Sequence, residues 1–188
     1  MTERWDGFHV HWDPFGPGMG DEPTPEENLR LHARYEWAKS RRAEIIEATI
    51  FVESFLDSII ELCVAGASVD SRGRFRRFVL SAEFCTLFQK WKILRSLFDE
   101  EDLFKGVPGL EHRKENLRAL HDLIEIRNVF AHSELSIERE TGRAFLNYFA
   151  NTKTFIVSEE SIAEVLSDAQ RVHQWLQEMY FYMVRNDE

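Results

Sequence analysis

Residues 117–132 read LRALHDLIEIRNVFAH, and the spacing of their apolar side chains decides the class of fold. Apolar residues recur there at intervals of three and four, which places them on one face of an α-helix. They are Leu117, Leu120, Leu123, Ile124, Ile126, Phe130 and Ala131. We therefore expect a long amphipathic helix over about residues 110–131.

Capping residues predict where three further helices begin. Residues 24–27 (TPEE) form a capping box with proline at the first helical position, so we expect a helix from there to Gly66, with a break near residues 40–42. Ser81 is the expected cap of the next helix, and Ser158 is that of a closing helix.

The first of these helices has carboxylates opposite its apolar face. Because the apolar face must be buried, we expect these carboxylates to face water. They are Glu47, Glu53, Asp57 and Glu61. Cys63 and Cys85 lie inside apolar helical patterns, so we expect both cysteines to serve packing.

Short segments with alternating polarity follow the helix that ends at Ala131. Residues 135–140 and 143–149 are expected to be strands joined across Thr141-Gly142, and residues 154–157 to add a third. The predicted fold class is therefore mainly α: a bundle of four to five helices, with a small β-hairpin or short antiparallel sheet between the last two long helices. We expect an irregular tail over residues 1–23 and a single domain over residues 24–188.

The composition excludes several classes of protein. A hydrophobic content of 44% with 15 Phe is ample for a globular core. A net charge of -10 argues against indiscriminate binding to nucleic acid, because phosphate neutralisation is the main source of that affinity. The start of the chain has no secretory pattern, and no apolar run is long enough to span a membrane. We expect a cytoplasmic protein without a cofactor or a metal site.

One segment is basic despite the acidic total. Four arginines fall within residues 71–78, and three further cations follow before residue 96. They are Arg72, Arg74, Arg76, Arg77, Lys90, Lys92 and Arg95. Two interpretations stay open: these side chains form a surface that docks RNA, or they form a solvated loop and the polar side of a helix.

Arg127 lies at the centre of the apolar face of the helix over residues 110–131, where a leucine would be expected. A guanidinium cannot shed its charge, so it needs a carboxylate of the fold or an anionic ligand. Asn128 and His132 lie four residues apart on the flank of that face. An imidazole can transfer protons near neutral pH, and a guanidinium can stabilise charge on a phosphate. Either these groups form a site, or Arg127 makes an internal ion pair and His132 only caps the helix.

Residues 126–133, IRNVFAHS, resemble the R-x4-H signature of the HEPN superfamily. The Phe- and Leu-rich helices before the motif, and the hairpin and last helix after it, are also similar to bacterial members. The likeness covers residues 25–185 in architecture and eight residues in detail. It implies a homodimer in which two such helices face each other and line a shared cleft, with RNA as a ligand and an antitoxin or regulatory protein as a further partner.

Catalytic HEPN proteins are metal-independent endoribonucleases, and many are toxins or anti-phage effectors. By this resemblance Arg127 would stabilise charge on the phosphate, His132 would act as general base or acid, and Asn128 would orient one of them. The products would be a 2',3'-cyclic phosphate and a 5'-hydroxyl. Some members instead serve as non-catalytic binding or regulatory modules, which is the alternative function.

Glu134 departs from the family pattern. Members that a partner nucleotidyltransferase modifies often carry Tyr two residues after the His, so that regulation is not expected here. An acidic residue at this position could repel a phosphate or hold the imidazole ring.

Overall fold

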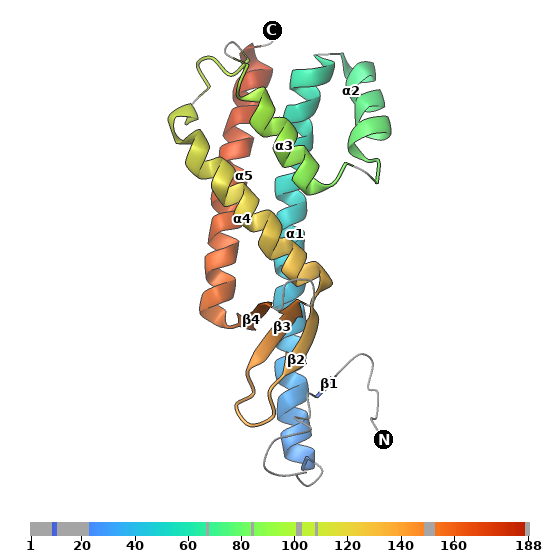
Figure 1. The fold of residues 1–188 in the computed structure, drawn as a ribbon, viewed down its shortest axis with the longest axis vertical. Helices are drawn as coiled ribbons and strands as arrows, with labels where there is room; N and C mark the ends of the chain where they lie inside the picture. The colour runs from blue at the N-terminus through green and yellow to red at the C-terminus, as the bar shows by residue number, and fades with distance from the viewer. Residues whose placement is uncertain are drawn as a thin grey trace. The chain divides into compact units, whose positions relative to one another are not determined.

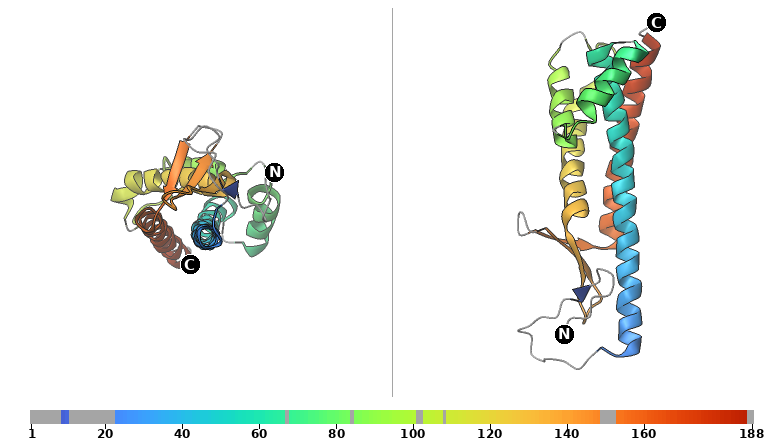
Figure 2. Two further views of the ribbon diagram at one scale, coloured as in Figure 1. Left: turned by 90° about the horizontal axis from the view of Figure 1, so that it is seen from below. Right: turned by 90° about the vertical axis from the view of Figure 1, so that its right-hand side faces the viewer.

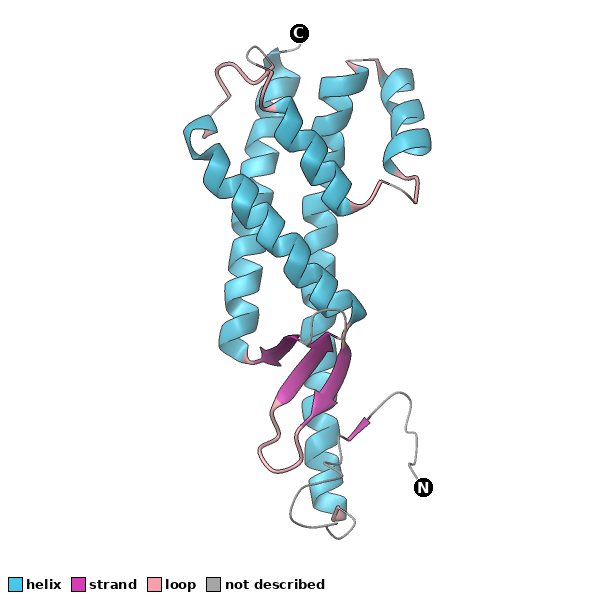
Figure 3. Cartoon of the chain, in the orientation of Figure 1, coloured by secondary structure: helices cyan, strands magenta, loops and turns pink. Residues whose placement is uncertain are grey.

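The computed structural model describes residues 9–10, 23–66, 68–83, 85–100, 103–107, 109–148 and 153–186. Within them lie five α-helices, one π-helix, one 3-10 helix and four strands (Figures 1 and 3). The mainly helical class with a small sheet, expected from the sequence, is therefore confirmed. The chain forms two compact units: unit 1 comprises residues 1–46 and 127–164, and unit 2 comprises residues 47–126 and 165–188.

The helices and strands follow one another in a simple order along the chain. The helices are α1 (Pro25–Ala65), α2 (Val69–Phe75), η1 (Arg76–Leu80), α3 (Leu87–Leu97), η2 (Leu110–His112), α4 (Arg113–His132) and α5 (Glu159–Asn186). The strands are β1 (His9–Val10), β2 (Glu134–Ile137), β3 (Ala144–Tyr148) and β4 (Lys153–Val157).

Helix α1 begins at the predicted capping box. The Thr24 backbone N–H donates to the Glu27 carboxylate at 3.1 Å, and the Glu27 N–H donates to the Thr24 hydroxyl at 3.2 Å. The predicted break near residues 40–42 is wrong, because α1 is continuous. After Pro25 the helix contains no proline and no glycine, so nothing in its backbone interrupts the hydrogen-bond ladder.

Unit 1 is built on a small sheet beside the first part of α1 (Figure 2). Strands β2, β3 and β4 are antiparallel neighbours, and β1 pairs with β2 in parallel. The Arg30 guanidinium donates to the Arg139 carbonyl at 3.1 Å, and that of Arg34 to the Val157 carbonyl at 3.3 Å. The core of unit 1 consists of Leu31, Ala38, Ile45, Phe130, Leu135, Ile137, Ala144, Leu146, Val157 and Ile162.

Unit 2 is helical. The Trp91 indole of α3 donates to the Leu117 carbonyl of α4 at 2.9 Å. Phe55 of α1 meets His173 of α5 edge to face, with 4.9 Å between ring centroids. The buried side chains of unit 2 include Val52, Leu56, Ile59, Ile60, Leu80, Leu94, Leu120, Leu123, Ile124, Val172, Leu176 and Met179. The apolar stripes predicted for α1, α4 and α5 therefore supply its core.

The segment between α1 and α3 differs from the prediction. Residues 69–80, expected to include a loop, form α2 and η1, and the Ser68 hydroxyl accepts from the Ser71 N–H at the start of α2. Helix α3 begins at Leu87 and not after Ser81, because the Thr86 hydroxyl caps it by accepting from the Gln89 N–H at 3.3 Å.

The remaining predictions on organisation have mixed outcomes. The single domain over residues 24–188 stays a prediction, and residues 1–8 and 11–22 of the tail lie outside the described residues. Cys85 is buried and Cys63 half-buried. Along the described stretches of the chain, no helix combines the length and the apolar character that crossing a membrane requires.

Candidate active site

The C-terminal end of α4 is anchored on both sides of His132. Phe130 is fully buried and meets Phe155 of β4 edge to face, with 5.1 Å between ring centroids. Ser133 is 5% exposed, and its backbone N–H donates to the Val129 carbonyl at 3.0 Å. His132 itself is exposed. An accessible imidazole is thus attached to backbone that the core of unit 1 holds in place.

Arg42 of α1 caps this helix end. Its guanidinium donates to the Ala131 carbonyl at 2.8 Å and to the Ser133 carbonyl at 3.2 Å. Carbonyls at the last turn of a helix have no partners within the helix and carry partial negative charge. Because Arg42 binds two carbonyls that flank His132, it reduces the repulsion that an approaching anion would meet there.

Arg127 is half-buried. One guanidinium nitrogen donates to the Asn128 side-chain oxygen at 3.4 Å, and no carboxylate of the described residues forms an ion pair with it. The internal ion pair considered from the sequence is therefore not found in the part of the chain that the structure describes. A guanidinium has five N–H donors, so most of those of Arg127 remain for a ligand.

Arg127 and His132 point in different directions from α4. Five residues along an α-helix correspond to a rotation of about 140° and a rise of about 7.5 Å. Arg127 falls in line with the buried side chains Leu123 and Ile124, whereas His132 is exposed at the terminus. One copy of the helix therefore does not aim both groups at a single phosphate.

The acidic residue after the motif faces solvent. Glu134 is the first residue of β2 and is exposed, while the three residues that follow it in the strand are buried. Among the described residues, no group of three or more His, Cys, Asp or Glu side chains is arranged to hold a metal ion.

Lys90, one of the residues expected to dock RNA, is buried. Its ammonium lies 2.6 Å from the Glu53 carboxylate and 2.9 Å from that of Asp57, and its side chain is 5% exposed. Burial alone would lower the pKa of Lys90, but the hydrogen bonds with Glu53 and Asp57 outweigh it and raise the pKa above its ordinary value. Lys90 thus neutralises two carboxylates of its own unit, which corrects the docking role expected for it.

The other basic residues of this segment have varied surroundings. Arg76 binds Glu61, and the cations of Arg77, Lys92 and Arg95 lie over the rings of Phe78, Phe88 and Trp91. Arg72 is half-buried, and Arg74 is exposed. No ion pair, hydrogen bond or ring contact between described residues joins the basic side chains of α2 and η1 to those of α3. A role in docking RNA stays a prediction for the residues other than Lys90.

The carboxylates of α1 also differ from expectation. Glu47 is exposed as predicted, but Glu61 is 7% exposed and Asp57 is half-buried. Burial raises the pKa of Asp57, and the opposing hydrogen bond with Lys90 does not cancel that effect. Asp57 and Glu61 face cations of α3 and η1, because those elements lie against this side of α1.

The residue that sequence reasoning missed is Arg42. The signal was the pair Arg41-Arg42 in the middle of a helix, one turn before the buried Ile45. A cation beside a buried position needs acceptors, and free carbonyls at a helix end provide them. Comparisons with protein-family models, with curated proteins and with solved structures found no match to this chain.

Proposed function

We propose that this chain is a HEPN-like, metal-independent endoribonuclease of the toxin or defence type. The observation that carries the proposal is the half-buried Arg127 guanidinium, which no carboxylate of the described residues neutralises, on the same helix end as the exposed His132. A cation kept without a counter-ion in the fold is available for an anion from outside. The phosphodiester of RNA is such an anion.

The reaction needs one group that accepts a proton and one that donates a proton. A base takes the proton of the 2'-hydroxyl, the 2'-oxygen attacks phosphorus, and the bond from phosphorus to the 5'-oxygen breaks while an acid protonates that oxygen. His132 would fill one of these roles. Arg127 would offset the charge that grows on the phosphate, and Asn128, through its hydrogen bond to Arg127, would orient the guanidinium.

The angle between Arg127 and His132 favours a site assembled from two copies. Positions 127 and 132 are rotated by about 140° about the axis of an ideal helix, and a second copy would bring a guanidinium and an imidazole to the same phosphate from two helices. This arrangement agrees with the homodimer that the HEPN resemblance implies, and a neutralising antitoxin would act by covering the shared cleft.

Cleavage of single-stranded RNA in the presence of EDTA tests the proposal. The wild-type chain should release products with 2',3'-cyclic phosphate and 5'-hydroxyl ends, and Arg127→Ala or His132→Ala should lower the rate at least about a hundredfold. His112→Ala and Arg118→Ala are matched controls, because both side chains are well exposed and lie away from the end of α4. Equal rates in the wild type and both motif variants would refute the proposal.

Mixing the two inactive variants tests the shared site. If each phosphate is served by Arg127 of one copy and His132 of the other, a mixed dimer regains one intact pair and part of the activity. No recovery after subunit exchange, shown by differently tagged chains, would indicate that each copy works alone.

A non-catalytic HEPN-like binding module is the second candidate. Exposed Glu134, two residues after His132, favours it, because a carboxylate there repels a phosphate. This candidate predicts a stable dimer with no cleavage of RNA. If Glu134 only weakens a nuclease, Glu134→Gln should raise the cleavage rate, most strongly at low ionic strength.

A further inference from the structure

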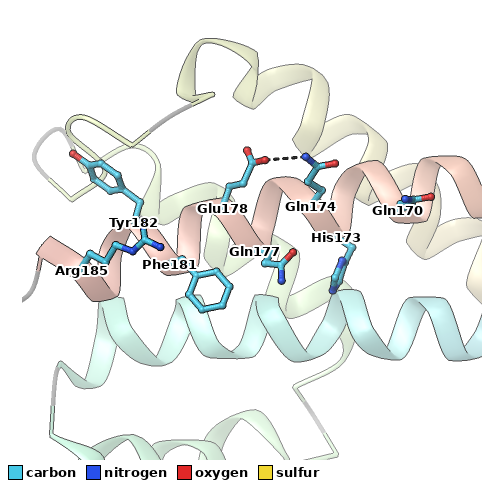
Figure 4. Close-up of a pocket in the computed structure, with 8 residues that line it drawn as sticks. All are labelled: Gln170, His173, Gln174, Gln177, Glu178, Phe181, Tyr182 and Arg185. Atoms are coloured by element: carbon cyan, nitrogen blue, oxygen red, sulfur yellow. Dashed lines mark hydrogen bonds between the residues drawn. The ribbon is translucent and has the colours of Figure 1, made fainter.

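Helices α1 and α5 form an exposed, uncharged face in unit 2. We call it the α1–α5 face and define it by Phe51, Phe55, His173, Gln177 and Phe181. Figure 4 shows His173, Gln177 and Phe181 directed from α5 toward α1, and a pocket of about 570 Å³ runs along the same helix. The rings of Phe55 and His173 connect the two helices, with 4.9 Å between their centroids.

The composition of this face is unusual for this chain. Charged residues make up 30% of the sequence, but the α1–α5 face has none. Phe51 is 56% exposed and Phe181 is 45% exposed, so large apolar groups of this face lie in contact with water. Exposed aromatic side chains grouped on one surface are typical of the core of a protein interface. The face is therefore suited to contact another protein surface.

Opposite charges lie at its two ends. Glu47 precedes Phe51 by one helical turn, and Arg185 follows Phe181 by one turn. Both are exposed, and neither forms an ion pair with another of the described residues. One end of the face is thus acidic and the other basic.

The layout is symmetric about the level of Phe55. The Phe55 ring contacts both His173 and Tyr180 of α5. Phe55 therefore lies at the level of the middle of residues 173–180, near Gln177. Within unit 2 the two helices run in the same direction (Figure 1). At about 1.5 Å per residue, Phe51 and Phe181 lie about 6 Å to either side of this level, and Glu47 and Arg185 about 12 Å.

We propose that the α1–α5 face is a two-fold symmetric contact between two copies of this chain. A two-fold axis at the level of Phe55 and Gln177 exchanges the ends of the face. Phe51 then meets Phe181 of the second copy, and Glu47 meets Arg185 of the second copy, so every contact occurs twice. The face is thus complementary to itself, in its apolar residues and in its charges. This self-complementarity identifies a second copy of the chain as the partner. The inference concerns unit 2 alone and stands whether or not Arg127 and His132 cleave RNA.

Reversing the charges at the ends tests the contact. The mass of the full-length chain is measured by light scattering and sedimentation over a dilution series. We expect the wild type to dimerise, and Glu47→Arg or Arg185→Glu to weaken the dimer about tenfold, since each replaces two attractive pairs by two repulsive ones. Glu115→Arg and Arg118→Glu change the charge equally at exposed sites of α4 and should leave the mass unchanged.

Mixing the two charge-reversed variants gives the decisive result. One variant then has arginine at both ends and the other has glutamate at both, so the mixture should form a heterodimer more readily than either forms a homodimer. The chain with both substitutions should dimerise like the wild type. Phe181→Glu should abolish dimerisation through the α1–α5 face, and its circular dichroism and melting temperature show whether it remains folded.

The proposal is overturned by a wild type that is monomeric throughout the dilution series. It is also overturned by a wild-type dimer that all three substitutions leave intact, because the copies then meet through another surface. A mixture of the charge-reversed variants that shows no preference for the heterodimer would refute the pairing of Glu47 with Arg185.

Discussion

Replacement of Lys90 by methionine should destabilise the protein strongly. Lys90 is 5% exposed and is shared by two carboxylates, at 2.6 Å from Glu53 and 2.9 Å from Asp57. Removing one partner of a buried ion pair costs about 3–5 kcal/mol, because it leaves an uncompensated charge. The Glu53 and Asp57 side chains keep 29% and 17% exposure, so water retains part of their solvation. We therefore expect a loss of about 3 kcal/mol, at the lower end of that range.

Urea unfolding followed by circular dichroism measures this loss. Lys92→Met is the matched control: Lys92 is exposed on the same helix and its ammonium lies over the Phe88 ring, so the variant should lose less than about 1 kcal/mol. The triple variant Lys90→Met, Glu53→Gln, Asp57→Asn removes all three charges and should recover most of the stability. A loss below about 1 kcal/mol for Lys90→Met, or a triple variant as unstable as the single one, would refute this account of the cluster.

Three further outcomes follow from described contacts. The pKa of Lys90 is raised in the folded state, so its stabilising contribution is complete below the ordinary lysine pKa of 10.5 and is lost as pH rises through the higher folded pKa. The urea midpoint of the wild type should therefore fall as pH rises above 10.5, and Lys90→Met should lack this part of the decrease. Arg42→Ala should cost about 1.5–3 kcal/mol by freeing two carbonyls, as measured by urea unfolding, and Arg41→Ala should cost less, because the Arg41 guanidinium bonds its half-exposed helix neighbour Glu44. Thr24→Ala should lower stability by about 1 kcal/mol and Thr24→Ser should not, and a thermal melt that fails to separate these two would contradict the capping box.

Features that depend on neighbours in sequence were predictable. Thr24 and Glu27 cap one another, and so do Ser158 and Ser161, so the starts of α1 and α5 follow from local chemistry. The strands that form β2, β3 and β4 alternate in polarity and were expected. The apolar stripe of α4, interrupted by Arg127, was predictable from the sequence, because helical periodicity alone defines it.

Features that depend on which elements face each other were not predictable. Asp57 and Glu61 occupy the polar side of α1, and that side faces water only if no cation lies against it. Lys90 and Arg76 come from elements 15 to 37 residues away, and periodicity does not reveal that pairing. The same limit hid Arg42, whose acceptors are the carbonyls of Ala131 and Ser133, 89 and 91 residues along the chain.

The contact of Arg42 with the end of α4 has a consequence for motion. Terminal turns of helices usually fray, and their amides then exchange with solvent quickly. Here a guanidinium from α1 and the inserted Phe130 ring restrain the last turn, so the amides of residues 131–133 should be protected from deuterium exchange, and Arg42→Ala should remove that protection. His132 therefore loses much of its backbone entropy when the protein folds, and a ligand that binds there does not have to order this segment.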